Sequence, residues 1–353
     1  MKEKMKRTVV ALLCILMVVT FMPITTATAA SKMKVEWFNV GAGDSMFIKF
    51  PNGQTVLIDG GTVTKGYTVV NKLRKMHVNT INYCISTHPD SDHCGGLKPV
   101  FEQLQVKNFY YPGDADYSAT ETASEVISLA RSEGCAMHNP ATDTRIHGGN
   151  GATLTFVESS EDYDTDNKDS LASFINYGDL QILTCGDCED GAEDAIEQHN
   201  CDIVQLPHHG SKYSTDMTFL QRFDPEMVVV STDGHKYGHP NREVFSRCKR
   251  YDSKIKVWRT DKVGDIVVTA TGKSWKFARS GVLASKYINA APSSKNTGNS
   301  SSKVTAGYVY ITRTGTRYHS RKNCRGLSNA RKIYKVPISE ARAKGLTKCK
   351  LCW

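Results

Sequence analysis

The segment Thr87-His-Pro-Asp-Ser-Asp-His-Cys-Gly-Gly-Leu97 holds four potential metal ligands within six positions: His88, Asp90, Asp92 and His93. The residues before it, 81–86, are apolar and β-prone, which predicts a buried strand that ends at the ligands. Side chains in a loop after a strand can converge on one point. Imidazole nitrogen and carboxylate oxygen suit zinc, manganese or iron. The alternative is a polar turn that binds no metal.

Other ligand-type side chains also follow predicted strands. They are Asp59 after residues 55–58, Asp187 after 180–184, His208 and His209 after 202–206, and His239 after 227–231. Paired His residues after a strand are again in a ligand position. For Asp59 and His239, an ordinary turn residue is the alternative.

Predicted strands and helices alternate in blocks along most of the chain. We expect strands at 34–40, 46–50, 55–58, 81–86, 106–111, 153–157, 171–177, 180–184, 202–206 and 227–231, and helices at 68–76, 97–104, 121–133 and 192–199. This order suits an α/β fold with two sheets face to face and helices outside, an αββα sandwich. The 353 residues and 40% hydrophobic content allow one large core and a small second unit.

Residues 88–93 resemble the His-x-His-x-Asp-His signature of the metallo-β-lactamase fold. Asp90 stands where most members have a second His. That departure resembles the hydrolase domain of the ComEC competence proteins, whose motif is His-x-Asp-x-Asp-His. The turn Gly41-Ala-Gly-Asp44, the strand-terminal Asp59 and the segment Pro207-His-His-Gly-Ser211 resemble the same group. The resemblance implies the αββα fold and a metal-dependent hydrolase.

The resemblance also implies a role for each site residue. Two divalent metal ions, zinc or manganese, would be held by His88, Asp90, Asp92, His93, Asp187 and His209. Catalysis would be carried by Asp92, Asp187 and His239, with Asp187 bridging the ions and His239 contacting a phosphate or acting as a general acid. Asp59 would support the ligands from behind, and His208 would do so or contact substrate.

One ligand of the family is absent here. Metallo-β-lactamase folds usually supply a His between the first motif and the Gly-Asp. This chain has Asn167 there, in a segment that resembles the Asn-x-x-Ser-Leu of the ComEC-like group. Asn is a poor ligand, so Asn167 is expected only to support the site. We therefore expect the metal position of His88 and Asp90 to be the weaker of the two.

Residues 1–30 are typical of a secretory signal peptide. They combine a basic start, an apolar run from Thr8 to Pro23 and a small-residue cleavage site, Ala27-Thr-Ala29. We expect a secreted, extracellular protein with no transmembrane domain after cleavage. An uncleaved N-terminal anchor is the alternative.

The C-terminal part differs in charge from the rest of the chain. Residues 282–306 are predicted to be a flexible linker, and residues 307–353 a separate module. The module has twelve Lys or Arg against one acid, a net charge of +11, whereas residues 31–306 carry −5. With interleaved tyrosines, this charge suits DNA or another polyanion. A solvated basic surface, or adhesion to an anionic cell wall, is the alternative.

The same module contains His319, Cys324, Cys349 and Cys352, a set that fits one tetrahedral zinc ion. A short helix is predicted at 337–345, between the two halves of the set. The module resembles the small Ada-type metal-binding domains. So short a module buries little core, so a metal or disulfide is physically expected. The alternative is a Cys349–Cys352 disulfide.

These features predict that residues 31–281 form an exported metal-dependent phosphodiesterase or nuclease that acts on DNA or a related polyanion. Two alternatives stay open. One is a hydrolase of a small ester, lactam or thioester. The other is a non-catalytic polyanion-binding protein with a degenerate metal site.

Overall fold

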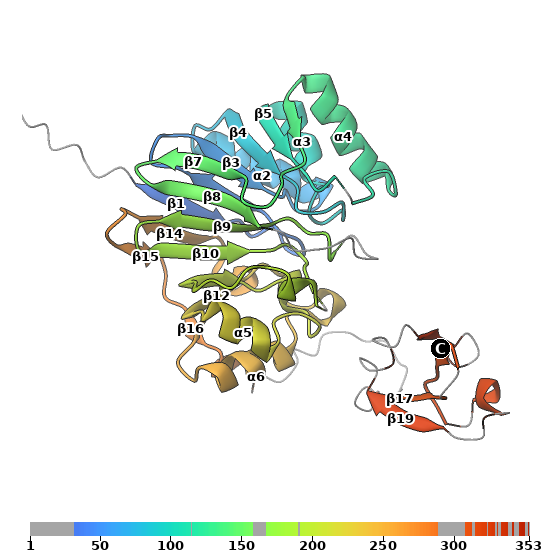
Figure 1. The fold of residues 1–353 in the computed structure, drawn as a ribbon. Helices are drawn as coiled ribbons and strands as arrows, with labels where there is room; N and C mark the ends of the chain where they lie inside the picture. The colour runs from blue at the N-terminus through green and yellow to red at the C-terminus, as the bar shows by residue number, and fades with distance from the viewer. Residues whose placement is uncertain are drawn as a thin grey trace, which may run out of the picture. The chain divides into compact units, whose positions relative to one another are not determined.

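A computed structural model gives the fold of the chain (Figure 1). It describes residues 32–113, 115–157, 167–189, 191–288, 308–312, 315–322, 324–328, 330, 333–337, 341, 346–349 and 352. The chain forms two units, Met1–Ala290 and Ala291–Trp353. The predicted signal peptide, most of the predicted linker and the predicted helix at 337–345 lie largely or wholly outside the described residues.

Among the described residues, the first unit contains two eight-stranded sheets. The first sheet has the order β15-β14-β1-β2-β3-β4-β5-β6, with β1 Met33–Trp37, β2 Met46–Lys49, β3 Thr55–Ile58, β4 Thr80–Ile85, β5 Gln105–Tyr110, β6 Ala136–His138, β14 Ile266–Ala270 and β15 Trp275–Phe277. The second has the order β16-β13-β12-β11-β10-β9-β8-β7, with β7 Arg145–Gly149, β8 Ala152–Val157, β9 Ala172–Tyr177, β10 Leu180–Thr184, β11 Ile203–Gln205, β12 Met227–Val230, β13 Lys256–Arg259 and β16 Val282–Leu283.

Alternating side chains of each strand pack the two sheets against each other. Val35 and Trp37 of β1 and Ile48 of β2 share a buried cluster with Phe156 and Ile182 of the second sheet. Phe47, next to Ile48 in sequence, points the opposite way and joins a cluster with the helices. This period of two is what a strand buried on both faces requires.

Helices cover the outer face of each sheet. Their bounds are α2 Val63–Lys75, α3 Leu97–Gln103, α4 Glu121–Glu133, α5 Met217–Phe223, α6 Arg242–Tyr251, α7 Thr260–Val263 and α8 Ser285–Ile288. Apolar residues of α2, α3 and α4 pack on the first sheet, and those of α5 and α6 pack on the second. The predicted αββα sandwich is therefore confirmed (Figure 1).

Parallel strands bring the polar segments of the sequence to one end of the sandwich. β3, β4 and β5 run parallel in the first sheet, and β10, β11, β12 and β13 do so in the second. The carboxyl ends of parallel strands lie at the same edge of a sheet. The loops after β3, β4, β10, β11 and β12 hold the predicted site residues of this unit except Asn167, which precedes β9.

Most predicted boundaries agree with the structure within three residues, but three predictions differ more clearly. Residues 192–199 form only a 3₁₀ turn, Ala192–Asp194, and the carbonyls of Glu193 and Ile196 accept hydrogen bonds from the Arg222 side chain. The helix predicted from residue 68 begins at Val63. The linker predicted from residue 282 begins no earlier than residue 289, since β16 pairs with β13 and Tyr287 of α8 packs on Phe245.

The second unit is small and held by two short strand pairs. β17 Tyr308–Ile311 pairs with β19 Tyr334–Pro337, and β18 Arg317–Tyr318 pairs with β20 Thr347–Lys348. A 3₁₀ turn, Arg325–Leu327, lies between β18 and β19 in sequence. Across the described residues of both units, no helix is long and apolar enough to cross a membrane.

Candidate metal centre

Four buried side chains converge at the carboxyl ends of strands from both sheets: Asp44, His93, Asp187 and His209. One ligand atom of each lies within 4.8 Å of one ligand atom of every other. Asp44 lies between β1 and β2, His93 follows β4, Asp187 follows β10 and His209 follows β11. Pairing of the strands therefore assembles the cluster from positions far apart in the sequence.

The geometry of these four side chains fits a cation. Nε2 of His93 lies 3.3 Å from Nε2 of His209 and 3.2 Å from Oδ1 of Asp187, and Nε2 of His209 lies 3.6 Å from Oδ2 of Asp187. Oδ1 of Asp187 and Oδ1 of Asp44 are buried and accept no hydrogen bond. Buried polar atoms are normally satisfied, so these atoms lack a partner that a metal ion would supply. Two imidazoles and two carboxylates suit zinc or manganese.

His88 and Asp90 form a second pair of ligand groups beside Asp187. Nε2 of His88 lies 3.8 Å from Oδ2 of Asp90 and 4.0 Å from Oδ2 of Asp187. The His88 ring is fully buried and its Nε2 has no hydrogen-bond partner, whereas the Asp90 side chain is 51% exposed. Oδ2 of Asp187 lies nearest His88 and its Oδ1 lies 3.2 Å from Nε2 of His93, so this carboxylate could serve ions at both positions.

The Asp92 carboxylate is not one of the four converging side chains, but it lines the same hollow as His209. Its Oδ2 is 3.5 Å from Nζ of Lys236. Asp44, which the sequence analysis gave no role, occupies the cluster instead, and its amide donates to the carbonyl of Asp92 over 3.2 Å. Asp44 offered a weaker signal than the other ligands, since it is an acid in the turn between two buried strands, β1 and β2.

Asp59 fixes the loop that carries His88 to His93, on the side of His93 away from the cluster. Its carboxylate accepts hydrogen bonds from the amide of Thr87 (2.8 Å) and the hydroxyl of Thr87 (2.7 Å), and lies 2.9 Å from Nδ1 of His93. These contacts orient Nε2 of His93 toward the cluster. A carboxylate behind a ligating imidazole also raises the basicity of the ring.

Asp44 has its own buried support. The indole nitrogen of Trp37 donates to Oε1 of Gln205 (2.8 Å), and Nε2 of Gln205 donates to Oδ2 of Asp44 (2.5 Å). Oδ1 of Asp44 then lies 3.4 Å from Nδ1 of His209. A fixed amide therefore aims the free oxygen of Asp44 at the cluster. Gln205, on β11, carried no signal in the sequence.

His208 and His239 line the open side of the centre. Nδ1 of His208 lies 2.8 Å from Oε2 of Glu189, and its Nε2 lies 3.6 Å from Oδ2 of Asp187. The His239 ring is 5.1 Å from the His208 ring, and its buried Nδ1 has no hydrogen-bond partner. Glu189 was missed by the sequence analysis, although it lies only two residues beyond Asp187.

Asn167 supports the metal centre through its backbone carbonyl. Its carbonyl accepts a hydrogen bond from the amide of Ser170 (3.3 Å), and the Ser170 hydroxyl accepts one from the amide of Asp187 (3.2 Å). The Asn-x-x-Ser segment thus positions the loop of Asp187 through its serine. Asp164 and Asp166, in the same polar stretch, lie outside the described residues.

The charges of the cluster compensate one another. Burial alone would raise the pKa of Asp187, but the neighbouring His93 and His209 lower it well below its usual value. Burial would lower the pKa of His209, but Asp187 and Asp44 raise it to about 9. Two buried acids beside these rings therefore require positive charge, which protonated imidazoles or a bound cation can supply.

The second unit contains a separate cluster: His319, Cys324, Cys349 and Cys352. Sγ of Cys324 lies 3.8 Å from Sγ of Cys349, and Sγ of Cys352 lies 3.8 Å from Nδ1 of His319. Bonds of about 2.3 Å to the corners of a tetrahedron place two sulfurs about 3.8 Å apart. A disulfide needs about 2.05 Å, and these cysteines are free.

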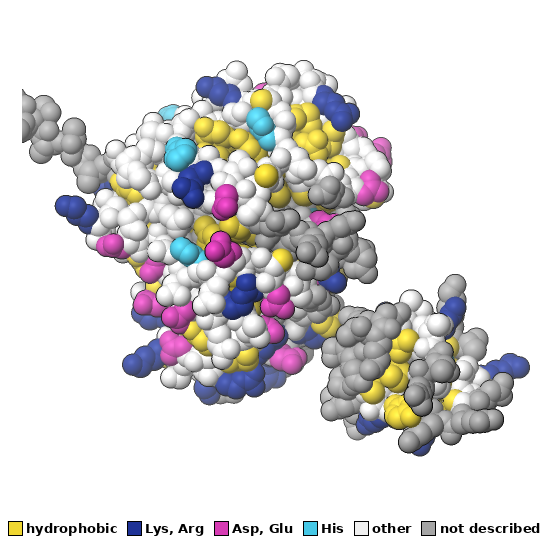
Figure 2. Space-filling model, viewed as in Figure 1, with side chains coloured by type: hydrophobic (Ala, Val, Ile, Leu, Met, Phe, Trp, Pro, Cys, Tyr) yellow, Lys and Arg dark blue, Asp and Glu magenta, His cyan; other side chains and the backbone are white. Residues whose placement is uncertain are grey.

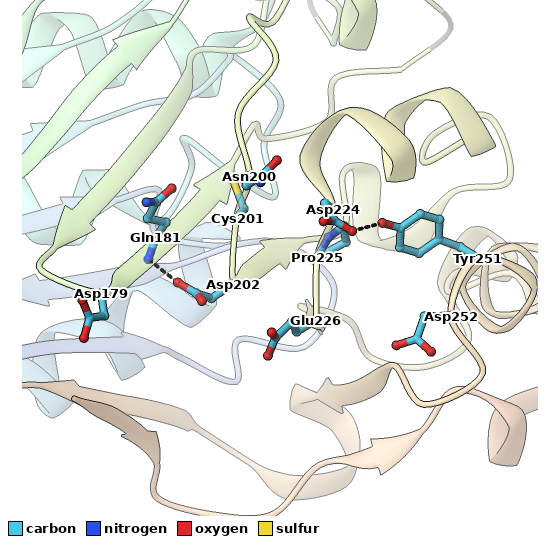
Figure 3. A pocket seen from close by; sticks show the side chains of 10 residues that line it. All are labelled: Asp179, Gln181, Asn200, Cys201, Asp202, Asp224, Pro225, Glu226, Tyr251 and Asp252. Atoms are coloured by element: carbon cyan, nitrogen blue, oxygen red, sulfur yellow. Dashed lines mark hydrogen bonds between the residues drawn. The ribbon is translucent and has the colours of Figure 1, made fainter. Parts of the chain in front are cut away.

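A hollow lies at the amino ends of β10, β11 and β12, away from the metal centre. It has a volume of about 570 Å³ and is lined by Asp179, Gln181, Asn200, Cys201, Asp202, Asp224, Pro225, Glu226, Tyr251 and Asp252 (Figure 3). Asp179, Asp202 and Glu226 directly precede β10, β11 and β12. The hollow is thus separated from the metal centre by the length of the strands.

Residues 38–235 match the family model of the metallo-beta-lactamase superfamily, which is more than half of the chain. The chain belongs to this superfamily. As a metallo-β-lactamase-fold protein it is a metal-dependent hydrolase by family, and the cluster of Asp44, His93, Asp187 and His209 supports divalent metal binding.

Curated relatives of this metallo-β-lactamase-fold chain confirm the resemblance to competence proteins. It is 25% identical over 261 residues to ComE operon protein 3 of Bacillus subtilis (67% of this chain, 33% of the relative). It is 27% identical over 246 residues to competence protein ComA of Neisseria gonorrhoeae (67% and 32%). The chain therefore spans about a third of the length of these relatives.

Solved metallo-β-lactamase-fold structures are more distant. YhfI of Bacillus subtilis is 13% identical with a TM-score of 0.42, covering 70% of this chain and all of YhfI. Zinc-bound PqqB of Methylobacterium extorquens is 11% identical with a TM-score of 0.42, covering 62% and 85%. The family assignment rests on the family model, not on these likenesses.

Proposed function

We propose that this chain is an exported metal-dependent phosphodiesterase, a nuclease that acts on DNA or a related polyanion. The observation that carries the proposal is the buried cluster of Asp44, His93, Asp187 and His209, with His88 and Asp90 beside it. When bound there, divalent ions lower the pKa of water and neutralise charge that develops on a phosphoryl group. The relatives named as competence proteins favour a nucleic-acid substrate.

The chain's own residues supply orientation and proton transfer. Burial, with His208 and His209 nearby, lowers the pKa of His239 to about 4, so its ring is neutral near pH 7 and accepts rather than donates a proton. Burial opposes protonation of His208 too, but its hydrogen bond to Glu189 raises its pKa. We therefore assign the proton donor for the leaving oxygen to His208, with Glu189 positioning it.

Positive charge for an anionic substrate comes from two places. Lys236 lies at the rim of the centre, 3.5 Å from Asp92. The second unit carries a net charge of +11 over residues 307–353. Acidic and basic side chains are interspersed over the visible face of the first unit (Figure 2). Long-range attraction of a polyanion is therefore assigned to the second unit, and local contact to Lys236.

A substrate panel tests the proposal. The full chain, loaded with manganese or zinc, is offered single-stranded DNA, duplex DNA, RNA, bis(p-nitrophenyl) phosphate and a chromogenic lactam. We expect turnover of the phosphodiesters and none of the lactam. Lactam turnover without phosphodiester turnover would favour the small-molecule hydrolase. Absence of bound metal and of any turnover would favour a non-catalytic binding protein.

We also propose one zinc ion at His319, Cys324, Cys349 and Cys352. The spacing of the sulfurs supports it, as does Gly326, where a Cβ would lie 2.9 Å from the His319 ring and 3.3 Å from Sγ of Cys349. Cys349→Ser should lower the zinc content of the full chain by one ion. Equal zinc content, together with loss of a disulfide on reduction, would replace zinc by a Cys349–Cys352 disulfide.

A further inference from the structure

The loop Asp233–His239 forms the rim of the metal centre and carries an unusually exposed aromatic ring. Tyr237 is 74% exposed, the highest value among the large hydrophobic side chains of the described residues. It lines a narrow hollow with Asp92, His209, Lys236 and His239, among others. A soluble protein buries most aromatic rings, so an exposed one at the mouth of a site is informative.

The backbone holds Tyr237 in this place at some cost. Its φ is +55°, in the left-handed region that residues with a side chain rarely adopt. The neighbouring backbone is pinned, because the amide of Lys236 donates to the Asp233 carboxylate over 2.8 Å and the amide of His239 donates to the carbonyl of Lys236 over 3.0 Å. Strain of this kind persists where the surrounding contacts enforce it.

An ammonium group accompanies the ring. Nζ of Lys236 lies 4.6 Å from the centroid of Tyr237 and 3.5 Å from Oδ2 of Asp92. The ammonium therefore lies over one face of the ring, in the hollow that the cluster residue His209 also lines, and the other face of the ring is the one that can meet a planar group. A nucleotide presents the complementary pair, a planar base and a negative phosphate, at similar spacing.

We propose that Tyr237 stacks on the nucleobase next to the scissile phosphate while Lys236 pairs with a phosphate oxygen. The inference rests on the proposed phosphodiesterase function and names its substrate class as single-stranded nucleic acid. Bases in a duplex stack on one another and leave no free face, whereas those of a single strand are available to an aromatic side chain. The ring accepts any base, so the selectivity is for the presence of a base rather than its identity.

The test compares a base-bearing tetranucleotide with one of the same length made of abasic units. Binding is followed by fluorescence anisotropy of a labelled strand with non-cleavable phosphorothioate linkages, so the protein keeps its metal ions. The proteins are the full chain, Tyr237→Ala, Tyr237→Phe and Tyr67→Ala. Tyr67 is the matched control, since it is 48% exposed on α2 and does not line the hollow. The basic second unit meets the same phosphates in both strands, so the affinity ratio isolates the base.

We expect the full chain to prefer the base-bearing strand about ten-fold, the scale of one base–aromatic stack. Tyr237→Ala should abolish that preference, while Tyr237→Phe and Tyr67→Ala retain it. An unchanged preference in Tyr237→Ala, or no preference in the full chain, would overturn the proposal. Retained stacking in a metal-loaded protein that cleaves no phosphodiester would refute the proposed function and leave the base contact standing.

Discussion

At the scale of single residues, each ligand of the centre is held by another buried group. His93 is oriented by Asp59, and Asp44 by Gln205. The ring of His209 lies 3.1 Å from the carbonyl of Ser231. A hydrogen bond to a charged group contributes about 1.5–3 kcal/mol, and losing such a partner typically lowers metal affinity 10- to 100-fold. The supporting residues are therefore part of the metal centre's function.

Asp187 lies within 4.0 Å of His88, His93 and His209, so its removal should affect both metal positions. We expect Asp187→Ala to lose all measurable hydrolysis and at least one bound ion while its circular dichroism stays native. Turnover of bis(p-nitrophenyl) phosphate and metal content per chain are the measurements. Asp179→Ala, at the far end of β10, is the control and should keep both. Full activity in folded Asp187→Ala would contradict a shared bridging role.

Asp90 replaces an imidazole by a harder oxygen donor, and Asp44 adds another to the cluster. Oxygen donors favour manganese relative to sites rich in imidazole. We expect manganese to support at least as much activity as zinc in the native chain. Asp90→His should shift the ratio of zinc-supported to manganese-supported activity upward. A metal titration in which only zinc activates the native chain would contradict this assignment.

At the scale of elements, close backbone contacts pack the loop that carries His93 against α2 and α3. Gly66 of α2 faces the carbonyl of Gly96, which lies between the ligand motif and the first residue of α3. Gly96 in turn faces Gly60, and its amide donates to the carbonyl of Gly61 over 2.6 Å. Small residues at these contacts let α2 approach the loop that carries His93.

Gly66→Ala sets two effects against each other. Alanine in a helix interior gains about 1 kcal/mol over glycine. Here its Cβ would lie 2.3 Å from the carbonyl oxygen of Gly96 and 2.5 Å from the Pro99 ring, an overlap that costs about 1–3 kcal/mol or more. We expect a net loss of stability and of metal affinity, measured by urea unfolding and metal titration. A stabilised Gly66→Ala with unchanged affinity would show that the two segments move apart freely.

Glu193 in the turn after β10 is buried against the loop before α5, where its carboxylate accepts hydrogen bonds from the amide of Thr215. Burial raises its pKa well above the usual 4.5, although the Thr215 amide opposes this. The folded state therefore binds a proton that the unfolded state has released. The stabilisation that this bound proton gives the folded state is fully present below about pH 4.5. It is lost as pH rises through the folded pKa of Glu193, so the free energy of unfolding falls by up to about 1.4 kcal/mol per pH unit.

Glu193→Gln keeps an acceptor for the Thr215 amide and cannot ionise. We expect its free energy of unfolding, relative to the native chain, to rise as pH increases from 5 to 7. Urea unfolding at three pH values measures the trend. Glu197→Gln is the exposed control and should differ from the native chain by less than about 0.5 kcal/mol throughout. A pH-independent difference for Glu193→Gln would refute the raised pKa.

At the scale of the whole molecule, the metal centre and the strongest net charge lie in different units of the chain. The first unit contains every side chain of the metal centre, and the second carries the strongest net charge. The division falls after residue 290, not at residue 282, because α8 packs on α6 and Arg259 lies over the ring of Tyr287 at 4.9 Å. A cut inside α8 would remove part of the first unit's packing.

Deleting residues 291–353 should leave turnover of bis(p-nitrophenyl) phosphate nearly unchanged. It should weaken binding to long duplex DNA and flatten the dependence of binding on salt. Each phosphate neutralised contributes about 0.9 to the slope of log affinity against log salt, so six contacts among the twelve basic residues of 307–353 would change it by roughly five. Binding isotherms at several salt concentrations test this. An unchanged affinity and slope would remove the second unit from substrate binding.

The sequence alone determined ten strands of the first unit and the ligand types that follow several of them, but not β6, β7 or β13 to β16. A strand of alternating apolar residues and a polar loop at its end are local patterns, so β4 with His88 to His93, and β11 with His208 and His209, could be predicted from neighbouring residues. The sandwich followed from the alternation of elements. The helix predicted at 192–199 was wrong: only Ala192–Asp194 is a 3₁₀ turn, and carbonyls of that segment bond to Arg222, which is distant in sequence.

Only the tertiary structure decided which of those polar residues meet. Asp44 enters the cluster and Asp92 turns to Lys236 because strand pairing and the packing of two sheets set distances that no local pattern contains. Gln205 and Glu189 gain their roles in the same way, since each partner lies in another loop. The period of apolar residues in a strand specifies which face of the sheet a side chain points to. Which side chains of the two sheets then contact one another depends on strand register and sheet twist across the whole sandwich.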